Sequence, residues 1–291
     1  MTEDTTTPAL AKARALLIAN RPEDALRDLA TLPASDALGA YAALLRCAAL
    51  LELGRWQETV DAAQAGLATS GPNPDLLCVL GRAEQQLNHL EAAERALLAG
   101  LALAPTDLDL LCAYAQLCIA AGQVDKAAKL TERATAQQPE APLVYATRIH
   151  LAYAQGDART AERISREFVG RYPESPTAHA LQGRMSALQG RVRPAYAGLA
   201  QAAAATPSNM DYADAAMELR VYRHPLLYPL RPLVRLGPLK SWVLAAALVF
   251  GTQAIGLLLL SNVLGLIWIT VCVYSWVVPP LVRRSLRRRW R

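Results

Sequence analysis

The side chains that most often perform chemistry in proteins are few in this sequence, and they are not clustered. None of the four histidines and five cysteines stands in a CxxC pair or in another spacing typical of a metal site. A glycine-rich phosphate loop and the GxSxG and HExxH motifs are also missing. The residues are His89, His150, His179, His224, Cys47, Cys78, Cys112, Cys118 and Cys272. We therefore expect a protein that is not an enzyme and that binds no metal and no cofactor.

Polar side chains recur instead at a regular distance along the chain. Arg82, Gln116, His150 and Arg184 follow one another at a constant 34-residue interval. If each unit of a repeated structure presents one of them, they line one continuous surface. Three more side chains near this series are expected on the same surface, namely Tyr41, Gln85 and Tyr153. We predict that this surface binds an extended or helical peptide of a protein partner.

Three further series share this 34-residue period. The first is Ala25, Thr59, Ala93, Ala127, Ala161 and Ala195; the second is Asn20, Gly54, Asn88, Gly122, Gly156 and Gly190; the third is Pro105, Pro139, Pro173 and Pro207. Gly and Asn tolerate the left-handed conformation that ends a helix before a tight turn. Alanine lets two helices approach closely, and proline stops a helix. The series predict a chain of helical hairpins.

This pattern resembles the tetratricopeptide repeat. The best-matching unit carries Leu77, Leu80, Gly81, Asn88, Ala93, Leu97 and Pro105. The usual Trp and Tyr positions of the family are mostly Leu, Ala or Cys here, and the first unit lacks the final proline. The resemblance covers roughly residues 8 to 207. It implies an all-α superhelix of about six repeats, whose concave wall binds other proteins.

The helices expected from this register come in pairs. The first helices of the pairs are expected at 8–19, 39–53, 74–87, 107–121, 141–155 and 176–189, and the second helices at 22–32, 55–69, 90–103, 124–137, 158–172 and 192–206. A further helix at 209–223 either caps the open end of the solenoid or serves as an amphipathic linker.

The C-terminal part has a different composition. No charged residue occurs from Trp242 to Val278, a stretch of 37 residues, and only Ser261 and Asn262 interrupt its apolar character. About 20 apolar residues span a bilayer core. We therefore predict two membrane-spanning helices near 241–260 and 263–280, joined as a hairpin.

Charge predicts the orientation of this hairpin. All 25 acidic residues precede residue 224, whereas nine of the 30 Lys and Arg follow it, so the basic pI of about 9.0 belongs to the C-terminal part. Basic residues flank both predicted spans, and the turn between them carries none. The positive-inside rule places both termini in the cytoplasm, with the basic tail on anionic lipid rather than on nucleic acid. We expect an integral protein of a bacterial cytoplasmic membrane.

Two of the polar side chains within the predicted spans are expected to pair with each other. Gln253 and Thr270 are equally far from the turn, so an antiparallel hairpin brings them to the same depth, where a hydrogen bond between them is favourable. Ala247 and Gly251, four residues apart, offer a surface for close helix packing.

The resulting domain plan has five parts. They are an N-terminal tail (1–7), the solenoid with its last helix (8–223), a proline-rich linker (224–240), the two spans (241–280) and a basic tail (281–291). Two functions fit this plan. One is a scaffold that holds a protein partner, expected to be acidic, at the cytoplasmic face of the membrane. The other is a structural subunit of a larger membrane complex for secretion, envelope assembly or transport, in which the repeats act as a brace.

Overall fold

A computed structural model describes most of the repeat region and parts of the C-terminal region. It describes residues 8–32, 39–207 and 209–223 and, further along, residues 243, 247, 250, 252–253, 262–266 and 268–275. All regular structure within these residues is α-helical. The fold of the described part is therefore all-α, as the sequence predicted.

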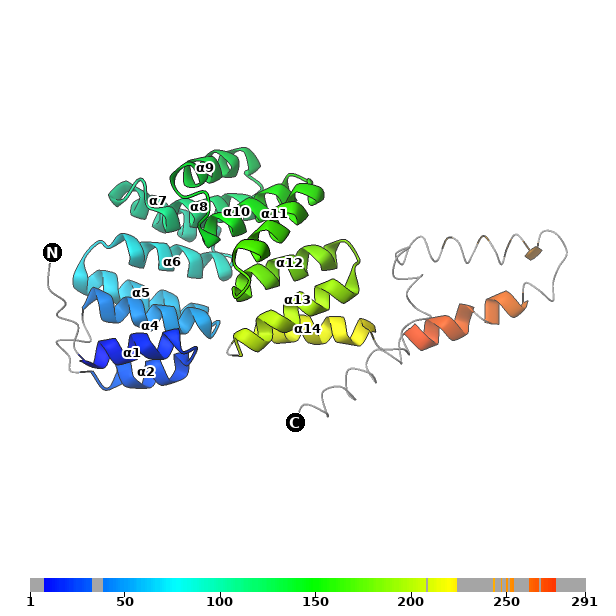
Figure 1. The fold of residues 1–291 in the computed structure, drawn as a ribbon, viewed down its shortest axis with the longest axis horizontal. Helices are drawn as coiled ribbons and strands as arrows, with labels where there is room; N and C mark the ends of the chain where they lie inside the picture. The colour runs from blue at the N-terminus through cyan, green and yellow to red at the C-terminus, as the bar shows by residue number, and fades with distance from the viewer. Residues whose placement is uncertain are drawn as a thin grey trace. The chain divides into compact units, whose positions relative to one another are not determined.

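The helices follow one another as antiparallel pairs, which Figure 1 shows stacked from α1 to α11. Their bounds are α1 Pro8–Ile18, α2 Pro22–Ala30, α4 Ala40–Glu52, α5 Trp56–Ser70, α6 Pro74–Gln86, α7 Leu90–Leu103, α8 Leu108–Ala120, α9 Val124–Gln137, α10 Pro142–Ala154, α11 Ala158–Arg171, α12 Pro176–Leu188, α13 Val192–Ala205 and α14 Met210–Arg223. Each helix predicted between residues 8 and 223 is present, with ends within two residues of the expected ones.

The turn inside each pair has the conformation that the Gly and Asn series predicted. The six residues of that series all have positive φ, from 58° at Asn20 to 79° at Gly156. In the turn after α8, the amide of Gln123 donates to the carbonyl of Cys118 at 2.8 Å, across the residue Gly122. This is the bond of a Schellman motif, which satisfies carbonyls at the helix end. The prediction of left-handed helix ends is confirmed.

Small residues let the paired helices approach closely. The alanine series, including Thr59, is completely buried. Gly81 of α6 faces Leu97 of α7 so closely that a Cβ atom would lie 2.5 Å from the leucine Cγ. Gly100 of α7 faces Leu110 of α8 in the same way, at 2.6 Å from the nearest methyl carbon. A larger side chain at these positions would separate the helix axes.

The buried core runs between the stacked helices. A central cluster joins α6, α7, α8, α9 and α10, and a second cluster joins α10, α11 and α12. In the second cluster the rings of Tyr145 and Phe168 stack with centroids 5.1 Å apart. Cysteines belong to this interior: burial raises the pKa of the Cys47 thiol to about 11 and that of Cys78 to about 12. The four cysteines between residues 47 and 118 are buried and free.

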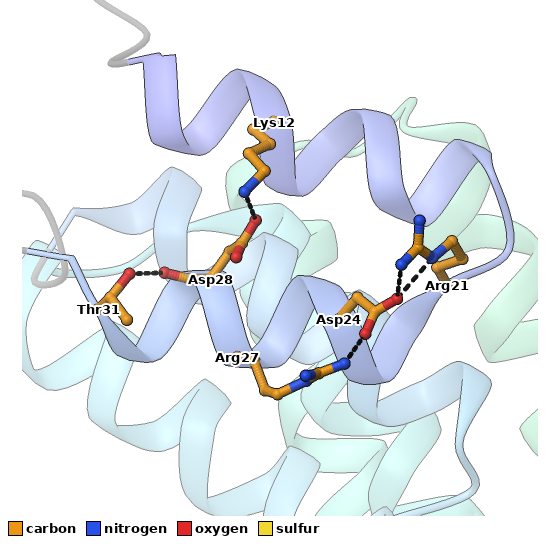
Figure 2. A network of polar contacts seen from close by, with 6 residues as sticks. All are labelled: Lys12, Arg21, Asp24, Arg27, Asp28 and Thr31. Atoms are coloured by element: carbon orange, nitrogen blue, oxygen red, sulfur yellow. Dashed lines mark hydrogen bonds and ion pairs between the residues drawn. The ribbon is translucent and has the colours of Figure 1, made fainter.

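The first hairpin carries a network of polar contacts on its surface. Figure 2 shows its members, which are Lys12, Arg21, Asp24, Arg27, Asp28 and Thr31. Asp24 pairs with the two arginines on either side of it, and Lys12 of α1 reaches Asp28 of α2 at 2.9 Å. Exposed ion pairs contribute at most about 1 kcal/mol each, so this network supplements the apolar packing of α1 on α2.

The chain divides into two compact units. One comprises Met1–Met185 and Gly198–Ala213, and the other Ser186–Ala197 and Asp214–Arg291. Among the residues that the structure describes, no helix combines the length and the apolar character needed to cross a bilayer. Most of the predicted spans, the linker at 224–240 and the tail at 281–291 lie outside the described residues. Their structure, and the domain boundary after residue 223, stay predictions.

Candidate protein-binding surface

The four polar residues of the 34-residue series occupy the same place in four helices. Arg82, Gln116, His150 and Arg184 are each the ninth residue of their helix, in α6, α8, α10 and α12 respectively. Arg82 and Arg184 are exposed, whereas the other two are half-buried. Because successive pairs stack in one register, the series lies on one surface of the repeat unit, which we call the A-helix surface.

Gln116 ties two neighbouring helices together. Its side-chain amide donates to the hydroxyl oxygen of Thr147 at 3.2 Å, which joins α8 to α10. The same hydroxyl donates to the carbonyl of Leu143 at 2.9 Å within α10. Gln116 therefore supports the surface as well as contributing to it.

The surroundings of His150 favour the neutral form of its imidazole. Burial lowers the pKa of the imidazole below 6.5, and the positive charge of Arg184 lowers it further. A lowered pKa disfavours a positive charge on His150 at neutral pH. Arg82 and Arg184 are the permanently charged members of the series.

Acidic residues that the sequence analysis missed lie beside Arg82. Asp75 and Asp109 occupy the same position in successive repeats, and each stands seven residues, or two helical turns, before a member of the series. Burial raises the pKa of Asp109, the charges of Asp107 and Asp75 raise it further, and Arg82 opposes them. Asp107 is also held by its capping role, since its carboxylate accepts from the amide of Leu110 at 2.8 Å. The 34-residue spacing of Asp75 and Asp109 is the sequence feature that could have revealed these acids.

These acids change the expected charge of the surface. Asp75, Asp107 and Arg82 all act on the pKa of Asp109, so three carboxylates and one guanidinium share this part of the surface. The α6–α8 part of the A-helix surface therefore carries acids as well as Arg82. The expectation of an acidic partner stays a prediction.

The three side chains predicted to lie near the series, Tyr41, Gln85 and Tyr153, differ in solvent exposure. The rings of Tyr41 and Tyr153 are 38% and 46% exposed, which leaves an apolar face with a polar tip in water. Gln85 is half-buried, three residues after Arg82 in α6. Tyr153 likewise stands three residues after His150 in α10, so it lies on the same side of its helix.

The structure describes three of the four residues expected to pack in the predicted membrane spans. Ala247 and Gln253 are exposed, and Gly251 lies outside the described residues. Thr270 donates its hydroxyl to the carbonyl of Leu266 at 2.8 Å, within its own helix. The pairing of Gln253 with Thr270 stays a prediction.

Comparison with known proteins places the repeats in a recognised family. Residues 78–142 and 147–210 match the family model described as tetratricopeptide repeat. No curated protein sequence matches the chain. Several solved structures share its fold at low sequence identity.

Three solved structures illustrate the likeness. A tetratricopeptide-repeat protein from Parabacteroides merdae is 14% identical, with a TM-score of 0.60 over 73% of this chain and 85% of that one. A thermophilic repeat protein from Thermus thermophilus is 18% identical, with a TM-score of 0.53 over 60% and 98%. PilW, a type IV pilus biogenesis factor, is 16% identical, with a TM-score of 0.53 over 74% and 98%. The family model identifies residues 78–142 and 147–210 as tetratricopeptide repeats, and the solved structures share the fold.

Proposed function

We propose that this protein is a scaffold that binds a segment of a protein partner on its A-helix surface and is held at a membrane by its C-terminal segment. Tetratricopeptide repeats bind peptides and proteins, and nothing in the described part points to catalysis. The observation that carries the proposal is the common register of Arg82, Gln116, His150 and Arg184, which makes one surface from four successive repeats.

The charges of this surface suggest the polarity of the partner segment. Arg184 has an exposed guanidinium beside a neutral imidazole, so it favours an acidic side chain of the partner. Asp75 and Asp109 favour a basic side chain at the other part of the surface. The proposed ligand is therefore an extended or helical segment whose charge changes from basic to acidic along its length.

The membrane attachment rests on the sequence and on the exposure of apolar side chains. The uncharged stretch from Trp242 to Val278 is long enough for two spans. In the described part of this stretch, Val263, Leu266, Ile269 and Val273 are between 54% and 70% exposed. Lipid would cover such a row of side chains at no desolvation cost. Basic residues on both sides of the stretch favour cytoplasmic termini, and the tail would then meet anionic lipid.

Purification of the full chain from membranes in a mild detergent tests the proposal. We expect the protein to copurify with a soluble protein, and we expect Arg184→Glu to abolish this capture. Arg95→Glu is the matched control, because Arg95 is an exposed arginine on α7, away from the A-helix surface. Capture that survives Arg184→Glu would remove the A-helix surface from the proposal. If a membrane protein copurifies in a fixed ratio with this chain and with both variants, the alternative function as a structural subunit of a membrane complex is favoured.

A further inference from the structure

Gln116 holds its side-chain amide in a fixed direction on the A-helix surface. Its Nε2 atom donates to the hydroxyl oxygen of Thr147 at 3.2 Å. That hydroxyl donates its own hydrogen to the carbonyl of Leu143 at 2.9 Å, so it can only accept from Gln116. The nitrogen of the amide therefore faces Thr147, and the oxygen Oε1 does not.

The oxygen of this amide is open to a ligand. Gln116 is half-buried, and none of the described residues donates a hydrogen bond to its Oε1 atom. The atom is also not one of the buried side-chain atoms that lack a partner, so it reaches solvent. Because the side chain is already ordered, a hydrogen bond to Oε1 costs little further rotamer freedom.

Thr147 is polar at a position that is apolar in the other repeats. The equivalent positions, at the 34-residue spacing, carry Val79, Ala113 and Leu181. Thr147 is completely buried, so it does not touch a ligand itself. A buried hydroxyl is unfavourable unless it is hydrogen-bonded, and here the bonds to its own helix and to α8 satisfy it. Thr147 is thus a positioning residue for Gln116.

One other group shares this hydroxyl. The buried thiol of Cys112, four residues before Gln116 in α8, also forms a hydrogen bond with Thr147. A hydroxyl oxygen accepts two hydrogen bonds, and a thiol is a weak donor. The thiol and the amide of Gln116 therefore bind the hydroxyl together, and the direction of the amide is kept.

The chemistry of Oε1 selects the group that donates to it. A cationic side chain of a ligand gains more from the carboxylates of Asp75 and Asp109 on the same surface, because charge-assisted hydrogen bonds are stronger. The neutral oxygen of Gln116 suits a neutral backbone N–H group. In a helical ligand these groups are used within the helix beyond its first turn, whereas an extended segment leaves them free.

We propose that the partner segment on the A-helix surface is extended, and that one of its backbone N–H groups donates to Oε1 of Gln116, which Thr147 holds in place. The inference rests on the proposed function, because it takes the A-helix surface as the binding site. It selects an extended segment over a helical one. The contact reads the backbone, so it does not depend on the partner's side chain at that point.

Synthetic peptides test this inference on the full chain in mild detergent. The probe is a fluorescent peptide with two lysines at its start, two glutamates at its end, and Ser and Val in alternation between them. The control peptide carries an N-methyl group on each residue between the charged ends, which removes the donors and keeps the chain extended. We expect fluorescence polarisation to report saturable binding of the probe, with the control about tenfold weaker, as loss of one hydrogen bond predicts. Equal binding of both peptides, or no saturable binding of the probe, would overturn the inference.

Variants locate the contact. Gln116→Met should weaken the probe about tenfold and should bind both peptides alike, which excludes a steric effect of the N-methyl groups. Thr147→Val should weaken the probe similarly, and Thr147→Ser, which keeps the hydroxyl, should bind as the unmodified chain does. Adding Thr147→Val to Gln116→Met should cause no further loss, because Thr147 acts through Gln116.

Thermal unfolding of each variant checks the fold, and Gln116→Met decides if Thr147→Val does not fold. Unchanged probe binding in a folded Gln116→Met variant would contradict the inference. Arg184→Glu then separates this failure from a failure of the proposed function. If Arg184→Glu abolishes probe binding and Gln116→Met does not, the A-helix surface stays the binding site and only the backbone contact is wrong. If neither variant changes probe binding, the A-helix surface is wrong as well.

Discussion

His150 of α10 lies close enough to Arg184 of α12 for the guanidinium charge to lower the pKa of the imidazole, in addition to the effect of burial. The two residues belong to successive repeats and each is the ninth residue of its helix. Their pairing makes the A-helix surface sensitive to acid, since protonation of His150 would place two cations side by side.

Arg184→Gln should raise the pKa of His150 towards 6.5 without restoring it fully, because burial is the larger cause and stays. NMR titration of the imidazole measures this pKa in both proteins. Arg95→Gln, which removes a cation from α7, serves as the control. An unchanged pKa in the Arg184 variant would mean that the two side chains do not interact.

The same depressed pKa predicts how stability depends on pH. The unfolded chain binds a proton at His150 near pH 6.5, whereas the folded chain binds it only at lower pH. Between the lowered pKa of the folded chain and pH 6.5, the unfolded state therefore binds more protons than the folded state. The free energy of unfolding falls as the pH drops below 6.5. His150→Gln should make the loss of Tm between pH 6.5 and pH 5 smaller. An equally steep loss in the variant would assign the effect to other groups.

Two glycines should respond oppositely to alanine. Gly122 has φ of 74° in the turn after α8, and a left-handed conformation costs a residue with a Cβ about 1–2 kcal/mol. Gly170 lies within α11 with no atom near the position of an added Cβ, so alanine there should stabilise by about 0.5–1 kcal/mol. Urea denaturation measures both changes. Destabilisation by Gly170→Ala, or none by Gly122→Ala, would contradict this account of the turns.

Charge reversal on the A-helix surface should have unequal effects at its two arginines. Arg184→Glu should make the free energy of partner binding less favourable by about 1–3 kcal/mol, the range of an interface anchor. Arg82→Glu should reduce the binding free energy by a smaller amount, because Asp75, Asp107 and Asp109 already oppose an acidic ligand at that position. Calorimetric titration with the captured partner compares the two. A larger loss at Arg82 would reverse the proposed polarity of the ligand.

The predicted topology has a simple consequence for both ends of the chain. Reporter domains that work only in the cytoplasm should be active when fused at Met1 and at Arg291, because basic residues flank the uncharged stretch on both sides. Reporters that work only outside should be inactive at both. Opposite behaviour of the two fusions would require one span instead of two.

The sequence predicted the helices well because their ends depend on local chemistry. Gly and Asn at the 34-residue spacing determine where each first helix stops, and the completely buried alanines determine where the second helix crosses it. These signals need no knowledge of neighbouring repeats. The same spacing puts Arg82 and Arg184 at the ninth position of their helices.

Features that depend on packing between repeats could not be predicted in the same way. The neutral state of His150 follows from its burial and from the approach of Arg184, which belongs to another helix pair. The hollow between α9 and α10, with Thr131, Arg148 and Leu151 in its lining, likewise forms only when the two helices pack together. Asp109 carried a visible signal, its spacing from Asp75, but its effect on the charge of the surface depends on burial.

Site-specific photo-crosslinking in cells tests the central claim most directly. A photoreactive amino acid at Tyr153 lies on the proposed A-helix surface, and one at Gln64 lies on the exposed side of α5. The account predicts a crosslinked partner from position 153, lost on adding Arg184→Glu, and none from position 64. A partner crosslinked at position 64 and absent at position 153 would contradict it.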